Sequence, residues 1–132
     1  MGRPKQSLVI DGESMVDRQV RLLRSVTPRV AVIGGSTHNA SAYNTVRVPD
    51  VYPGRGPLGG LYTALMESRT EFNLVLGCDL PLINGRLLRY LAIRAAASGS
   101  DVTVPRSHDG RLQPLCGVYR RRCLHAIRAR LA

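Results

Sequence analysis

The chain carries FNLVLGCDLP at residues 72–81, and this stretch decides the fold class. Its first half is a short apolar run, which is typical of a strand buried in a parallel sheet. Gly77 and Cys78 are small enough for a ligand to come close, and Asp79 follows them. Because a charge just past a buried strand costs free energy unless it is paired, Asp79 is a candidate ligand of a hard cation such as Mg²⁺. The stretch alone leaves open a second interpretation, a solvated turn aspartate that caps the next helix.

Short apolar strands alternate with helical patterns along the rest of the chain. Helices are expected at 14–26, 61–69, 84–98 and from 120 to the end, strands at 7–10, 30–33, 45–48, 101–105 and 113–119, and a polar loop at 36–44. This alternation predicts an α/β fold with a mostly parallel sheet and helices on both faces. Ligands bind beside the carboxyl ends of the strands in such sheets.

The composition fits one ordinary globular domain, residues 1–132, with 44% hydrophobic and 21% charged residues. No apolar run approaches the roughly 20 residues that span a bilayer, and no signal peptide is recognised, so we expect a cytoplasmic protein without a membrane partner. The three cysteines form no CxxC pair, which argues against a disulfide framework or a zinc site.

The formal net charge of +10 indicates anionic partners. Side chains that could stack on bases are scarce, since the chain has one Phe, no Trp and five Tyr. The positive charge and the scarcity of aromatic side chains together favour small phosphorylated ligands over nucleic acid. A solvated basic surface without a specific ligand would give the same net charge.

Two further segments are expected at the same sheet edge as Asp79. The first is GRPK at residues 2–5, where Lys5 supplies a compact cation suited to phosphate. The second is Asp50 with the glycine-rich PGRGPLGG at residues 53–60, which precedes a predicted helix. Backbone N–H groups and the helix dipole at such a place favour an anion or a polar nucleotide edge.

Four segments in this order resemble the molybdenum cofactor guanylyltransferases, a MobA-like nucleotidyltransferase family. They are MGRPK from residue 1, VPD-x5-GPLGGL from residue 48, LGCDLP from residue 76 and GRLQPLCGVY from residue 110. The resemblance implies a Rossmann-like three-layer sandwich of the nucleotide-diphospho-sugar transferase type. It also implies Mg²⁺-dependent transfer of GMP from GTP to the phosphate of molybdopterin cofactor with release of pyrophosphate, and proteins of that cofactor pathway as further partners.

The resemblance assigns roles to single residues of this sequence. Lys5 would contact the nucleotide phosphates and stabilise the charge that develops on pyrophosphate. Asp50 would help to recognise the guanine nucleotide, and Asp79 would bind both the nucleotide and Mg²⁺. Gln113 and Pro114 would lie on the side of the pterin acceptor.

The sequence also departs from the family pattern. Relatives open with a strand and a glycine loop of the form LAGGxSxRMG, and this chain starts at the Met-Gly of that loop. The first strand and most of the glycine loop are therefore expected to be missing, and relatives continue beyond the last helix. An Asn that often follows the strand at 30–33 is replaced by Gly34.

Other functions stay open on the sequence alone. Within enzymes, the chain could be a related cytidylyltransferase or a transferase with a different acceptor. Outside enzymes, it could be an inactive nucleotide-binding protein, or a basic protein that inserts residues 2–5 and 54–57 into the minor groove of DNA. His38, His108 and His125 have no matched partners in the sequence, so no histidine-based catalytic constellation is expected.

Overall fold

The computed structural model describes residues 9–10, 13–34, 45–80 and 83–131. Lys5, the rest of the segment at residues 2–5 and the loop expected at 36–44 lie outside these ranges. Within them no helix combines the length and the apolar character needed to cross a bilayer.

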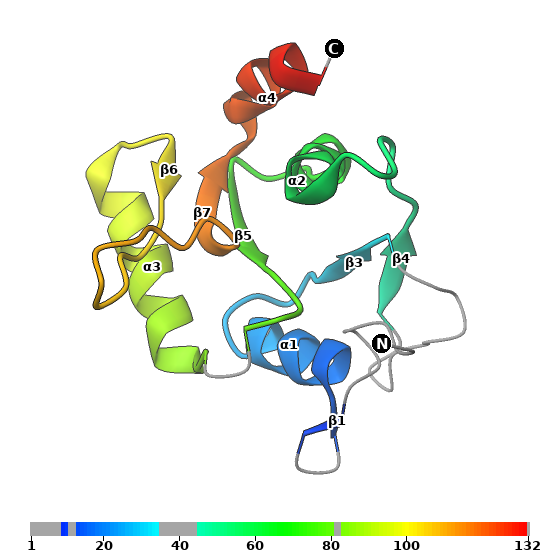
Figure 1. Cartoon of the computed structure of the whole chain (residues 1–132). Coiled ribbons are helices and arrows are strands. Elements are labelled where there is room, and N and C mark those ends of the chain that lie inside the picture. Colours follow the sequence, from blue (N-terminus) through cyan, green and yellow to red (C-terminus); the bar gives the residue numbers. More distant parts are fainter. Residues whose placement is uncertain (1–8, 11–12, 35–44, 81–82, 132) are drawn as a thin grey trace.

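The largest sheet has three strands, all antiparallel to their neighbours (Figure 1). Its centre is β7 (Cys116–Arg120), which pairs with β5 (Phe72–Leu76) on one side and β6 (Val102–Thr103) on the other. A separate parallel pair joins β3 (Ala31–Ile33) to β4 (Val46–Val48), and β1 (Val9–Ile10) and β2 (Glu13–Ser14) form a short antiparallel hairpin.

The prediction of a mostly parallel sheet is wrong for the described strands, where only β3 and β4 run parallel. The apolar run at residues 72–76 did indicate a strand covered on both faces, and that part is confirmed. Such a run carries no information on strand direction, because any strand between two helix layers reads as continuously apolar. Here β7 returns antiparallel to β5.

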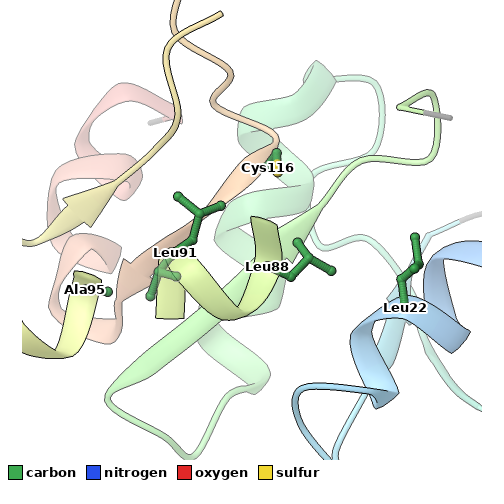
Figure 2. Close-up of a cluster of buried hydrophobic side chains, with 6 residues drawn as sticks. Leu22, Leu88, Leu91, Ala95 and Cys116 are labelled. Carbon is green, nitrogen blue, oxygen red and sulfur yellow. The ribbon is translucent and has the colours of Figure 1, made fainter. Parts of the chain in front are cut away.

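Helices pack on both faces of this sheet, as the alternating pattern predicted. On one face, α1 (Met15–Arg24) and α3 (Gly85–Ser98) enclose a core with β7, and Figure 2 shows Leu22, Leu88, Leu91 and Cys116 converging there. On the other face, α2 (Gly56–Glu67) and α4 (Leu124–Leu131) pack together, with Leu65 fully buried among them. Alternate residues of β7 divide between the two cores, since Val118 faces the first and Tyr119 the second.

Local sequence signals explain where α1 and α3 begin. The Ser14 hydroxyl accepts a hydrogen bond from the backbone N–H of Asp17 at 3.1 Å, and the Asn84 side chain accepts one from the N–H of Leu87 at 3.0 Å. Both contacts satisfy N–H groups that the helix itself cannot pair. Gly99 closes α3 in the left-handed conformation with φ 71°.

Helix α2 begins at Gly56, five residues before the start predicted at Leu61. The sequence predicts this helix only after the glycine-rich segment, but Pro57 suits the first turn of a helix because its missing N–H would be unpaired there anyway. Gly59 is needed inside the helix for a close approach: a Cβ at this position would lie 2.7 Å from the carbonyl oxygen of Tyr52. The segment therefore packs α2 against the chain that follows β4.

Candidate functional site

Asp79 lies in the turn that follows β5, and its side chain is exposed. The burial cost expected for a charge at this place therefore does not arise. The strand ladder ends just before it, where the N–H of Gly77 donates to the carbonyl of Leu115 at 2.7 Å. The carboxylate thus stands at the carboxyl end of a strand and is open to a ligand from solvent.

Gly77 leaves little room for a side chain beside Asp79. A Cβ on Gly77 would meet the Leu115 side chain at 3.1 Å and Oδ1 of Asp79 at 3.4 Å. The first distance is tighter than ordinary van der Waals contact, so a larger residue would displace either Leu115 or the aspartate turn. The absence of a side chain at Gly77 thus leaves space for the Asp79 carboxylate.

The turn is also held from α1 by Gln19. Its side-chain amide donates to the carbonyl oxygens of Gly77 at 2.8 Å and Leu80 at 3.2 Å. These two carbonyls stand on either side of Cys78 and Asp79. Sequence reasoning missed this residue, and the signal was available: Gln19 is a polar side chain in the helical stripe that contains Met15 and Leu22.

Asp50 follows β4 and is held differently. Its Oδ1 accepts hydrogen bonds from the backbone N–H of Tyr52 at 3.0 Å and from the hydroxyl of Thr63 at 3.1 Å. Thr63 is fully buried in α2 and also accepts from the N–H of Val51 at 2.9 Å. Asp50 therefore ties the chain after β4 to α2, and Thr63 is a second residue that sequence reasoning missed.

Asp50 and Asp79, two of the three groups expected at one sheet edge, follow strands of two different sheets, and the third group, residues 2–5, lies outside the described residues. Asp50 follows the parallel pair β3–β4, whereas Asp79 follows the three-stranded sheet. Gly34, at the end of β3, lies beside Asp50, since a Cβ on Gly34 would be 3.8 Å from that of Asp50. Helix α2 packs against β3, so it links the Asp50 region to the rest of the fold.

Gln113 and Pro114 lie just before β7, next to the end of β5. The N–H of Gln113 donates to the carbonyl of Pro105 at 3.0 Å, and its own carbonyl accepts from Cys116 at 3.1 Å. Leu115, the next residue along, contacts Gly77. The structure therefore brings the Gln113–Pro114 segment close to the turn that bears Asp79.

An apolar cavity of about 680 Å³ opens between α2, α4 and the start of β7. Its walls include Leu58, Leu61, Pro114, Tyr119 and Cys123, and neither Asp50 nor Asp79 lines it. Burial raises the pKa of the Cys123 thiol, and the charge of Asp101 raises it further. Burial likewise raises the pKa of Tyr119. Both groups stay protonated at neutral pH, so the cavity carries no activated nucleophile.

The donor set suits Mg²⁺ better than a metal that needs an all-protein cage. Among the described residues, no three His, Cys, Asp or Glu side chains gather where they could hold a metal. Mg²⁺ is usually bound through one or two carboxylates together with substrate phosphates and water. The exposed Asp79 carboxylate fits that mode. Asp50 is half-buried, and its Oδ1 accepts two hydrogen bonds from the protein.

The whole chain, residues 1–132, matches the profile of the MobA-like NTP transferase domain. The chain belongs to this family. A curated relative from Pelotomaculum thermopropionicum, named "Probable molybdenum cofactor guanylyltransferase", is 38% identical over 96% of the chain. The match covers 60% of that relative, so the MobA-like chain described here spans about three fifths of its length.

Two crystal structures share the fold of this MobA-like domain. One, from Aquifex aeolicus VF5, superposes with a TM-score of 0.77 at 28% identity and covers 88% of this chain and 60% of its own. The other, titled molybdopterin-guanine dinucleotide biosynthesis protein A, is from Archaeoglobus fulgidus and has a TM-score of 0.74 at 17% identity. It covers 98% of this chain and 66% of its own, and at that identity it speaks for the α/β fold alone.

Proposed function

We propose that this domain transfers GMP from GTP to the phosphate of molybdopterin cofactor and releases pyrophosphate. The observation that carries the proposal is the exposed carboxylate of Asp79 at the end of β5, in a chain that matches a nucleotidyltransferase family over its whole length. The name of the 38%-identical relative supports the choice of nucleotide and acceptor. The formal net charge of +10 suits two phosphorylated substrates.

The reaction is a substitution at phosphorus. A phosphate oxygen of the acceptor forms a bond to the α-phosphorus of GTP, and the bond between that phosphorus and the oxygen bridging to the β-phosphate breaks. Pyrophosphate leaves with the electron pair of the broken bond. Such a transfer depends on positioning and on charge neutralisation, and it needs no covalent nucleophile on the protein.

Each site residue predicted from the sequence has a place in this proposal. Asp79 would hold Mg²⁺, which when bound neutralises charge on the phosphate oxygens. Lys5, outside the described residues, would contact the same phosphates. Asp50 would help to recognise the guanine nucleotide through the chain that it ties to α2. Gln113 and Pro114 would face the acceptor, which agrees with their position beside the Asp79 turn.

A transfer assay tests the proposal. The chain is incubated with Mg²⁺, molybdopterin cofactor and either GTP or CTP, and pyrophosphate and the dinucleotide product are measured by coupled assay and mass spectrometry. We expect product with GTP, and Asp79→Asn should reduce its rate at least about 100-fold, because the carboxylate that would hold the charge-neutralising Mg²⁺ is lost. Glu67→Gln is the matched control, since Glu67 is an exposed carboxylate at the end of α2.

The outcomes separate the alternatives. Product with CTP and none with GTP would replace the guanylyltransferase assignment by a cytidylyltransferase. Nucleotide binding without any product would favour a nucleotide-binding protein without transfer activity. Full activity in Asp79→Asn would remove Asp79 from the metal role.

A further inference from the structure

Gln19 is one of only two buried polar side chains among the described residues, the other being Thr63. It is 5% exposed and sits in the apolar face of α1, next to Val20 and within a turn of Met15. A buried amide in such a place lowers stability unless its donors and acceptor are paired. The hydrogen-bond partners of the Gln19 amide therefore show which part of the chain it holds.

Both N–H groups of the Gln19 amide can be paired with the turn that carries Asp79. The nitrogen donates to Gly77 O at 2.8 Å and to Leu80 O at 3.2 Å, across 58 and 61 residues of sequence. These two carbonyls bracket Cys78 and Asp79, where the strand ladder has already ended at Gly77. Cys78 and Asp79 therefore lie beyond the ladder of β5, in the turn that the Gln19 amide contacts.

The acceptor of the same amide is paired as well. Arg18 donates to Oε1 of Gln19 at 3.2 Å, and its other terminal nitrogen donates to Ile83 O at 2.9 Å. Two consecutive residues of α1 thus hold the turn on both sides of Asp79. Only an amide supplies two donors and an acceptor at this length, so neither Met nor Glu can replace it.

We propose that Gln19 is a positioning residue, which fixes the backbone of the Gly77–Leu80 turn and thereby the place where the Asp79 carboxylate meets Mg²⁺. The inference rests on the proposed function, in which Asp79 binds the metal. Side chains that orient a metal ligand without touching the metal commonly change its affinity about 10- to 100-fold when they are removed. Gln19 contacts the peptide groups on either side of the ligand rather than the ligand itself.

The test measures the binding of Mn²⁺, as a stand-in for Mg²⁺, by electron paramagnetic resonance in the presence of GTP. Gln19→Met keeps the length and apolar stem of the side chain but removes both donors. We expect its affinity for Mn²⁺ to fall about 10-fold, while the affinity for GTP measured in EDTA stays that of the wild type. Hydrogen exchange at the amides of residues 78–80 should become faster in the same variant.

Two further variants make the measurement specific. Ser14→Ala removes the N-cap of α1 and weakens the helix without touching the turn, so it should bind Mn²⁺ as the wild type does. Arg18→Met removes the bond to Ile83 and the partner of Oε1 but keeps Gln19, and we expect an intermediate loss. It provides the same test if Gln19→Met does not fold, as judged by circular dichroism.

The outcomes distinguish this inference from the proposed function. If Asp79→Asn loses Mn²⁺ while Gln19→Met and Arg18→Met bind it like the wild type, the positioning role is wrong and the metal site stands. A loss in Ser14→Ala equal to that in Gln19→Met would also overturn the positioning role, because helix stability would explain both. If Asp79→Asn binds Mn²⁺ normally, the metal role fails, and with it the purpose assigned to Gln19.

Discussion

Asp50 and Asp79 carry the same sequence signature, a carboxylate after an apolar strand, and the fold uses them differently. Asp50 is half-buried, and its Oδ1 takes two donors, the N–H of Tyr52 and the hydroxyl of Thr63. Asp79 is exposed, and the protein holds the peptide groups around it through Gln19. Asp50 ties the chain after β4 to α2, and Asp79 lies in a turn that Gln19 of α1 holds. The difference depends on which element packs beside each strand end.

The largest effects are expected from the two hydrophobic cores, one on each face of the three-stranded sheet. Leu88 of α3 and Leu65 of α2 are both fully buried, in the cores on opposite faces of the sheet. Truncation of either to Ala should lower the free energy of unfolding by about 2–5 kcal/mol, because it removes apolar contacts and leaves a cavity. Chemical denaturation measures the loss.

The same two variants test whether the regions around Asp50 and Asp79 open independently of each other. Leu88→Ala should speed hydrogen exchange at residues 77–79, and Leu65→Ala should speed it at Val51 and Tyr52, each with little effect on the other region. Equal effects of both variants at both regions would show that the two carboxylates belong to one cooperative unit.

The hydroxyl of Thr63 offers a smaller and more local perturbation. Thr63→Val keeps the shape of the side chain but leaves the N–H of Val51 without its acceptor and Asp50 without a donor. We expect a loss of about 1–3 kcal/mol in unfolding free energy, because two hydrogen bonds are removed and one of them is to a carboxylate. Thr103→Val on the half-buried strand β6 is the control and should stay within about 0.5 kcal/mol of the wild type. A loss in Thr63→Val no larger than in this control would show that Asp50 does not depend on α2.

Two adjacent glycines of α2 respond in opposite directions if Asp50 and Tyr52 dock as described. Gly59→Ala places a Cβ 2.7 Å from Tyr52 O and should cost about 1–3 kcal/mol. Gly60→Ala meets nothing within 4 Å and should gain about 0.5–1 kcal/mol, because alanine favours helix. Thermal unfolding of the two variants checks the signs. Stabilisation by both would mean that the chain after β4 does not pack on α2 as closely as the structure has it.

The glycine on the Asp79 side gives the smallest expected effect. Gly77→Ala should cost about 1 kcal/mol of stability by crowding Leu115, and it should weaken Mn²⁺ binding by moving the aspartate turn. Leu115→Ala in the same chain relieves the contact, so the double variant should recover part of the metal affinity. Additive losses in calorimetric titrations would indicate that Gly77 and Leu115 act on the metal site independently.

The elements with strong local signals were predicted well. Ser14 and Asn84 are N-cap residues that mark the starts of α1 and α3, and the apolar run at 72–76 indicates β5. The direction of the neighbouring strand could not be predicted from the residues of β5, because it depends on how β7 pairs with β5, and the two strands are antiparallel. The start of α2 was missed although Pro57 is a local signal for it, because the need for Gly59 comes from a contact with Tyr52, which lies outside the helix.

The candidate site was predicted only in part. The positions of Gly77 and Asp79 after β5 followed from the local sequence, but the exposure of Asp79 and the residues that hold the two carboxylates did not. Gln19 and Thr63 look like ordinary helix residues until their partners, about 60 residues away in one case, are known. The roles of Lys5, Asp50, Gln113 and Pro114 stay predictions that the resemblance supplies.

The most direct test of the division between the carboxylates compares Asp79→Asn with Asp50→Asn in one binding experiment. Both changes remove a single negative charge and keep the size of the side chain. Mn²⁺ binding is followed by electron paramagnetic resonance at GTP concentrations that saturate both variants, and stability by chemical denaturation. We expect Asp79→Asn to lose at least about 10-fold in Mn²⁺ affinity at an unchanged free energy of unfolding. Asp50→Asn should keep the Mn²⁺ affinity of the wild type and lower the free energy of unfolding. Retained Mn²⁺ binding in Asp79→Asn, or its loss in Asp50→Asn, would contradict this expectation.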